Sequence, residues 1–183
     1  GSNVYESNPA DLFIRWTQFG AFSPLMQLHR QISANDLRQY PWGYTAAALN
    51  NYRTYAGLHH QLFPYIYSYA KKSTDTGVPI MRPLVLMNQT DTNTFGVKHT
   101  YYFGDEFVVA PVVALNTTSR NVYLPGGSWR DFWTGALHNG GQNVTWTNSD
   151  PSKFPVFVRE GAIIPMLLNV PQTLCRAEYV NNP

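Results

Sequence analysis

The sequence predicts an α+β fold in which a helical first part precedes an antiparallel sheet. Two observations predict it: apolar residues recur at helical spacing up to about residue 76, and short apolar runs separated by turn residues fill the rest. The length of 183 residues gives room for one domain or one and a half.

The first predicted helix begins after Asn8, because Asn8 can cap it and Pro9 suits its first position. Gly20 ends it. Three apolar residues recur at the spacing of one helical stripe: Leu12, Trp16 and Phe19. The sequence therefore predicts an amphipathic helix over residues 9–20.

Residues 21–29 form a short apolar segment that predicts a buried strand ending at His29. A side chain at the C-terminal end of an α/β-barrel strand faces the active site, which makes His29 a candidate active-site residue. The alternative is a capping or core histidine bonded to a loop carbonyl. The position of His29 alone favours this alternative.

A long helical pattern follows from about Tyr44 to Ser73. Pro64 should kink this helix or restart it, because proline lacks the amide donor and clashes with the preceding turn. The predicted face comprises Ala48, Tyr52, Tyr55, His59, Leu62, Ile66 and Ala70.

The second part has the residue types and turns of short strands. Gly104-Asp105, Pro125-Gly126-Gly127, Asn139-Gly140-Gly141 and Asp150-Pro151 supply the turn signals. The predicted strands are Tyr101–Phe103, Phe107–Val113, Asn121–Leu124, Trp129–Trp133, Val144–Thr147 and Phe154–Val158, after a lead-in at Pro79–Leu86. Many short strands with such turns are typical of an antiparallel sandwich or barrel.

Motifs that carry chemistry are few. Asp105 and Glu106 are the only adjacent acids, and a pair in a turn cannot face each other across a substrate. His59 and His60 lack the i, i+4 spacing of helical metal ligands, and the single cysteine, Cys175, excludes an internal disulfide. These residues show no catalytic constellation, and we predict no metal site and no cofactor in this chain.

Composition excludes two classes of partner. A net charge of +2 with scattered Lys and Arg does not support nucleic-acid binding, and no apolar run is long enough to span a membrane. Four sandwich aromatics could stack on sugar rings: Tyr123, Trp129, Trp133 and Trp146. Alternation along the strands favours the other interpretation, in which they fill the core.

A resemblance runs in order along nearly the whole chain. It starts in residues 9–29, with Arg15-Trp16, Gly20-Ala21-Phe22, Pro24 and a terminal His29, and includes Val109-Ala110-Pro111-Val112 and Gly161-Ala162-Ile163-Ile164-Pro165. The other matching segments are Pro41-Trp42, 62–67, 77–84, 104–113, 123–125, 127–129 and 155–165. This ordered set resembles glycoside hydrolase family 31, the family of α-glucosidases and α-xylosidases.

The resemblance implies where this chain lies in the family fold. Residues 1–76 would be the last helix-strand-helix of a (β/α)8 catalytic barrel, and residues 77–183 the β-sandwich after it, with its end truncated. Gln27-Leu28 departs from the family, which often has Arg before the histidine, so contacts of this loop stay open.

The family cleaves α-glycosides with retention, by double displacement between two carboxyl groups. Both carboxylates of the family come from barrel strands upstream of the matched region, so the resemblance implies a fragment that is inactive alone. His29 would contact the sugar before the cleaved bond. The implied partners are an α-linked oligosaccharide or glycoside and the missing N-terminal part of the same polypeptide.

Two other functions compete with a hydrolase fragment: a carbohydrate-binding module and a purely structural scaffold for a barrel. Low charge and few lysines fit an exported glycosidase, although sequons at Asn88, Asn116 and Asn143 occur about as often as chance predicts. This sequence does not distinguish a glucose substrate from a xylose substrate. It also does not distinguish hydrolysis from transglycosylation.

Overall fold

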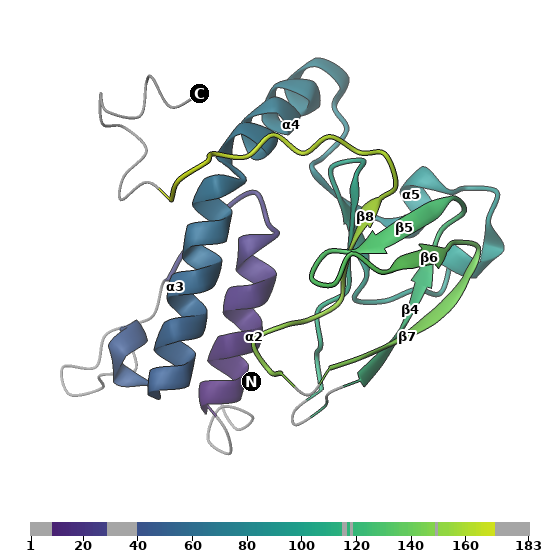
Figure 1. Cartoon of the computed structure of the whole chain (residues 1–183). Helices are drawn as coiled ribbons and strands as arrows, with labels where there is room; N and C mark the ends of the chain where they lie inside the picture. The colour runs from purple at the N-terminus through teal and green to yellow at the C-terminus, as the bar shows by residue number, and fades with distance from the viewer. Residues whose placement is uncertain (1–8, 29–39, 115–116, 118, 149, 171–183) are drawn as a thin grey trace. The chain divides into compact units, whose positions relative to one another are not determined.

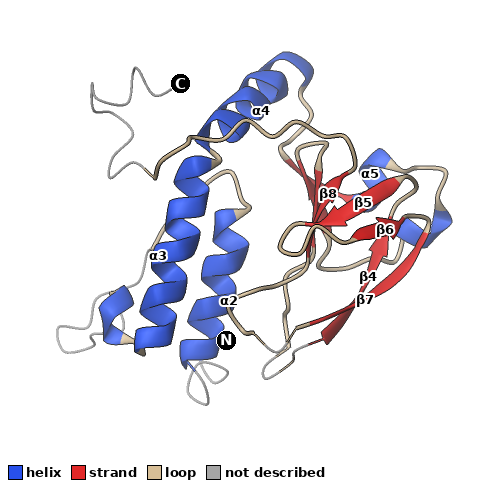
Figure 2. Ribbon diagram, viewed as in Figure 1, coloured by secondary structure: helices blue, strands red, loops and turns tan. Residues whose placement is uncertain are grey.

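The computed structural model describes residues 9–28, 40–114, 117, 119–148 and 150–170. The chain divides into two compact units, residues 1–64 with 166–183 and residues 65–165. Figure 1 labels their helices and strands, and Figure 2 separates helix from strand. The predicted domain limits of 1–76 and 77–183 differ from these units and stay a prediction about the family fold.

The first unit is helical and contains α2 (Pro9–Ala21), η2 (Pro41–Gly43) and α3 (Ala46–Gln61). Thr45 caps α3, because its hydroxyl accepts a hydrogen bond from the amide of Ala48 at 3.2 Å. α2 lies beside α3 (Figure 1), and Phe13, Ile14 and Ala48 are buried together. The predicted first helix is therefore present, while its predicted cap, Asn8, lies outside the described residues.

The face that α2 buries differs from the predicted stripe. Phe13 is 8% exposed and stacks on Tyr44 with ring centroids 4.2 Å apart, whereas Trp16 is 58% exposed and Phe19 is 37% exposed. Helix-period counting finds both apolar faces of such a helix but does not say which one meets α3.

No strand forms over the described part of the predicted segment 21–29. Ala21 ends α2, and residues 22–28 make a turn and then irregular backbone. A barrel strand takes its hydrogen bonds from a strand on each side, and the described part of this unit contains no such neighbour. The prediction of a buried strand was therefore wrong over residues 21–28, and its predicted end, His29, lies outside the described residues.

The predicted long helix restarts at its proline. α3 ends at Gln61, Leu62 separates the helices, and α4 runs from Phe63 to Thr76 with Pro64 in its first turn. The predicted face holds as far as Leu62, which is fully buried. Beyond the break the phase changes: Tyr65 is buried and Ala70 is exposed.

The second unit is an antiparallel sandwich, as predicted. One sheet has the order β1-β2-β3-β8-β5-β6, and the other pairs β4 with β7. The strands are β1 (Met81–Pro83), β2 (Tyr101–Phe103), β3 (Phe107–Val109), β4 (Ser119–Leu124), β5 (Ser128–Asp131), β6 (Leu137–Asn139), β7 (Gln142–Thr147) and β8 (Val156–Arg159), with two short helices, α5 (Leu84–Met87) and η3 (Thr92–Thr94).

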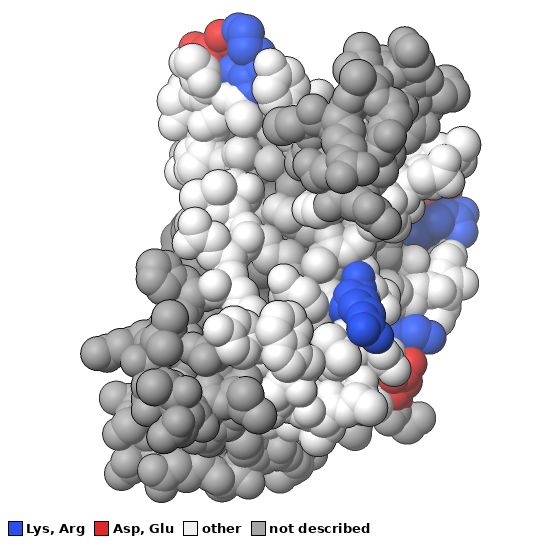
Figure 3. Space-filling model, turned by 90° about the vertical axis from the view of Figure 1, so that its left-hand side faces the viewer, with Lys and Arg blue, Asp and Glu red and all other residues white. Residues whose placement is uncertain are grey.

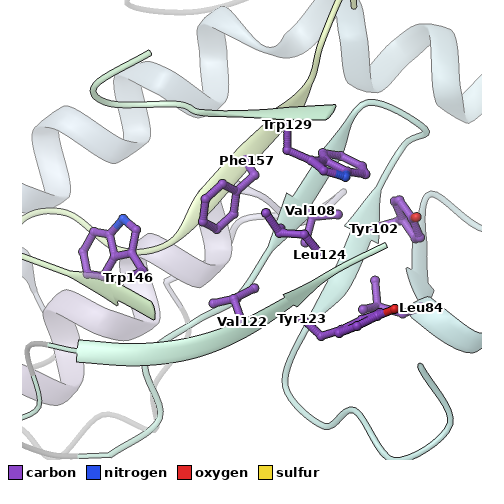
Figure 4. Close-up of a cluster of buried hydrophobic side chains, with 10 residues drawn as sticks. Leu84, Tyr102, Val108, Val122, Tyr123, Leu124, Trp129, Trp146 and Phe157 are labelled. Carbon is purple, nitrogen blue, oxygen red and sulfur yellow. The ribbon is translucent and has the colours of Figure 1, made fainter. Parts of the chain in front are cut away.

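The two sheets enclose the core of the sandwich (Figure 4). Val122 and Leu124 of β4 meet a cluster that includes Trp129, which is fully buried. β3 is shorter than predicted, since Pro111 cannot donate to a ladder. β6 was not predicted, because its three residues show no apolar alternation and Leu137 is 55% exposed.

Candidate functional site

The one substrate contact implied by the sequence, His29, lies outside the described residues. The structure does describe the backbone that leads toward it. Ser23 donates from its hydroxyl to the carbonyl of Phe19 at 2.9 Å and from its amide to the carbonyl of Gly20 at 3.2 Å. A side chain at Gly20 would place its Cβ 3.3 Å from Cγ of Met26, so the exit from α2 is a close turn.

His59 holds the end of α2 from the neighbouring helix. Its Nδ1 lies 3.1 Å from the carbonyl oxygen of Ala21, and only the protonated Nδ1 can donate to that acceptor. Burial lowers the pKa of His59, more than the carbonyl of Ala21 raises it, and nearby His60 lowers it further. The neutral imidazole is therefore the form that the fold favours.

A polar cluster joins α4 to the turn between β2 and β3. Glu106 Oε2 accepts hydrogen bonds from the hydroxyls of Tyr65 at 2.7 Å and Tyr69 at 2.6 Å. Burial and the Glu106 carboxylate raise the pKa of both tyrosines, so both stay protonated donors. We call Tyr65, Tyr69, Asp105 and Glu106 the turn cluster.

Asp105 completes the turn cluster through two cations. It forms ion pairs with Lys72 of α4 and with Arg82 of β1, whose Nη1 lies 2.6 Å from Oδ1. Burial alone would raise the pKa of Asp105, but hydrogen bonds from Lys72 and Arg82 outweigh it and lower the pKa. The two adjacent acids of the sequence, Asp105 and Glu106, therefore both bind side chains of the surrounding fold.

The other described carboxylates also bind side chains or backbone amides of the surrounding fold. Asp131 Oδ2 accepts from Trp146 Nε1 at 2.9 Å, and its Oδ1 accepts from the amides of Trp133 and Thr134. Tyr123 donates to Asp91 at 2.6 Å and lowers the pKa of that carboxyl. The remaining pairs are Asp11 with Arg15, Asp75 with Lys71, Asp150 with Ser152 and Glu160 with Arg130.

The four candidate sugar-stacking aromatics belong to the packing of the sandwich. Trp129 is fully buried, Trp146 is 8% exposed and Tyr123 is 7% exposed. Their polar atoms are also engaged: Trp129 Nε1 donates to Pro125 O at 2.8 Å, and half-buried Trp133 donates to Phe154 O at 2.7 Å. The rings of Tyr123, Trp129 and Trp146 are therefore buried in the core, and Trp133 alone of the four keeps part of its surface exposed.

Within the described ranges, no three His, Cys, Asp or Glu side chains are grouped to hold a metal ion. None of the helices described there is long and apolar enough to cross a membrane. On the face shown in Figure 3 the described charged side chains are few and form small groups, some with blue and red atoms side by side. The described residues on this face form no broad basic surface for a polyanion.

Comparison with known proteins assigns the family. The model of the glycosyl hydrolases family 31 TIM-barrel domain matches residues 2–69, and the model of the family 31 C-terminal domain matches residues 77–164. The chain belongs to glycosyl hydrolase family 31. The two matches follow the order of the two predicted parts.

Relatives in family 31 match along most of this chain. An isomaltosyltransferase of Sporosarcina globispora is 39% identical over 87% of the chain, and an α-xylosidase of Saccharolobus solfataricus is 35% identical over 86%. A dextranase of Flavobacterium johnsoniae, solved with isomaltotriose, superposes with a TM-score of 0.85 at 38% identity over 92% of the chain. The chain spans only 15%, 21% and 20% of these three proteins, respectively.

The turn cluster was not predicted from the sequence, although a signal for half of it exists. Tyr65 and Tyr69 are four residues apart and so share a face of a helix that begins near Pro64. Their acceptor lies 37 residues or more further along the chain, and no local pattern pairs them with Glu106.

Proposed function

We propose that this chain is the C-terminal part of a retaining α-glycosidase, and that the intact protein hydrolyses O-glycosyl bonds of α-glucosides. The observation that carries this proposal is the match to both the barrel and the C-terminal domain of family 31, in chain order. A barrel of this kind takes about 250 residues, far more than the matched residues 2–69.

The reaction needs two carboxyl groups about 5 Å apart, one to attack the anomeric carbon and one to protonate the leaving oxygen. Every carboxylate in the described part of this chain binds neighbouring residues of its own fold. We infer that the catalytic pair lies in barrel strands outside this chain, and that the chain alone is inactive.

The relatives' names support one substrate class for the proposal. Isomaltose and isomaltotriose are α-(1→6)-linked glucose oligomers, and two of the three relatives above are named for such chains or solved with one. We propose α-(1→6)-linked glucose oligomers as substrate. An α-xyloside is the second candidate, because the α-xylosidase relative is nearly as similar.

His29 is the residue of this chain that we propose to contact the sugar. A hydrogen bond to a substrate hydroxyl that strengthens in the transition state raises kcat without moving a proton. In the longer protein, His29→Ala should therefore lower kcat/KM on isomaltotriose by about 100-fold with unchanged folding. His99→Asn, at an exposed histidine with φ of 57°, is the matched control that should keep full activity.

A carbohydrate-binding module remains the competing proposal, and the structure gives it little support because three of the four candidate aromatics are buried and Trp133 is half-buried. A scaffold role for residues 77–183 is compatible with the hydrolase and needs no sugar contact. Isothermal titration of the 183-residue chain with isomaltotriose distinguishes the carbohydrate-binding module from the scaffold. Binding that is lost in Trp133→Ala would favour the module, and no binding would favour the scaffold.

A further inference from the structure

Two aromatic side chains just before α3 are exposed and stacked on each other. The rings of Tyr40 and Trp42 have centroids 4.7 Å apart and an angle of 4° between their planes. Tyr40 is 38% exposed and Trp42 is 64% exposed. Within the described residues, neither the Tyr40 hydroxyl nor Trp42 Nε1 has a hydrogen-bond partner. We call Tyr40 and Trp42 the aromatic pair.

The turn that carries the aromatic pair is held in place on both sides. Pro41 is buried and begins η2, and the amide of Gly43 donates to the carbonyl of Tyr40 at 3.0 Å. The next residue, Tyr44, stacks on Phe13 of α2 and so anchors the turn to the helical unit. Proline also fixes φ at its own position. A ligand of the aromatic pair would therefore not have to order this turn, which lowers the cost of binding.

Parallel aromatic rings with polar edges suit a carbohydrate. The C–H bonds on one side of a glucose ring carry partial positive charge and pack on the negative face of an aromatic ring. A phenol hydroxyl and an indole N–H can also bind sugar hydroxyls at the edges of the rings. In a core, by contrast, these polar atoms usually have partners within the protein. Trp42 is the more exposed ring and offers the larger surface.

The family fold gives the aromatic pair a place relative to the substrate. Residues 2–69 match the TIM-barrel model, and the aromatic pair lies between His29 and α3 in that range. In such a barrel the loops from strand to helix form the active-site face. Because the helices form the outer ring, the start of a helix lies at the rim of this face, farther from the cleaved bond than a strand end.

We propose that the aromatic pair binds glucose units of the α-glucan beyond the two units that flank the cleaved bond, with Trp42 as the stacking ring. This inference rests on the proposed function. It adds an outer binding subsite to that function, and a residue that favours longer chains over short ones. The alternative occupant of this surface is the preceding part of the barrel, which would give Trp42 a packing role and no preference for chain length.

The dependence of kcat/KM on chain length tests the proposal. The longer polypeptide expressed from the same gene is assayed on isomaltose and on isomaltohexaose. Trp42→Ala should lower kcat/KM about tenfold on isomaltohexaose and by no more than about twofold on isomaltose, because only the longer chain reaches the rim. Trp42→Phe keeps a stacking face and should lose no more than about threefold on isomaltohexaose. Phe95→Ala, at an exposed ring of the other unit, is the matched control and should leave both values unchanged.

Three results would overturn the proposal: a loss on isomaltose as large as that on isomaltohexaose, no loss on either substrate, or a gene product no longer than this chain. The first would assign Trp42 to packing. A longer polypeptide that cleaves no α-glucoside would refute the proposed function, and isothermal titration with isomaltohexaose then tests the aromatic pair without catalysis. The dissociation constant should rise about tenfold in Trp42→Ala. An unchanged constant, or no binding to the unsubstituted protein, would overturn the proposal.

Discussion

Gly104 shows how one residue fixes the approach of α4 to the sheet. Its φ is +64°, and a Cβ built there would lie 1.9 Å from the hydroxyl oxygen of Tyr65. Its amide donates to the carbonyl of Ile80 at 2.9 Å, so the backbone cannot move away freely. Both the backbone conformation and the space require glycine at this position.

Gly104→Ala should therefore destabilise the second unit by about 2–4 kcal/mol, the sum of the left-handed conformation and a clash with a buried tyrosine. Urea unfolding followed by tryptophan fluorescence measures the change. Gly96→Ala is the control, because nothing lies within 4 Å of its built Cβ. Equal stability of the two variants would contradict the close packing described here.

Asp105 makes stability depend on pH in the acid range. Its folded-state pKa is lowered, so its contribution is complete above the unfolded value of about 3.9 and is lost as the pH falls through the folded value. Asp105→Asn should lower the free energy of unfolding by about 2 kcal/mol at pH 7, since Arg82 stays buried without its carboxylate partner. Below pH 4 the free energy of unfolding should fall less steeply with pH in this variant, as measured by urea unfolding across pH. A loss of stability that is as steep in the variant would contradict this role.

At the scale of elements, α4 is bound to the sandwich by the turn cluster. Tyr65 also packs edge-on against Phe107, with centroids 5.3 Å apart, so polar and apolar contacts combine at one end of the helix. The family models leave residues 70–76 unmatched, although Lys72 in that range binds Asp105. α4 therefore belongs structurally with the unit of residues 65–165.

A double-mutant cycle measures this attachment. Tyr69→Phe and Glu106→Gln should each cost about 1–2 kcal/mol of unfolding free energy, because each leaves a partly buried polar group with a weaker partner. The coupling energy between them should be about 1 kcal/mol. Additive effects would show that the 2.6 Å contact does not contribute to stability.

The sequence predicts elements well where the signal is local. The proline that restarts a helix and the turn glycines between strands act through their immediate neighbours, and both predictions were confirmed at Pro64 and in the sandwich. The strand expected over residues 21–29 depends on partners far away in a barrel, and the helix face that meets α3 depends on packing. Neither of these follows from periodicity.

At the scale of the whole molecule, the sequence predicts only part of the candidate site. The family resemblance led to His29, which lies outside the described residues. The described acids all bind neighbouring residues of their own fold, and a sequence shows such long-range partners only in part. The chain alone should release no glucose from isomaltotriose or dextran. Release at a rate comparable to that of the longer protein would place a catalytic pair within these 183 residues.

The central claim is that this chain completes a retaining α-glycosidase. The most direct test is to express the longer polypeptide from the gene and follow isomaltotriose cleavage by proton NMR in the first minutes. We predict that α-glucose appears first and converts to the β-anomer by mutarotation, as double displacement requires. Initial release of β-glucose, or no cleavage of any α-glucoside or α-xyloside, would contradict the account.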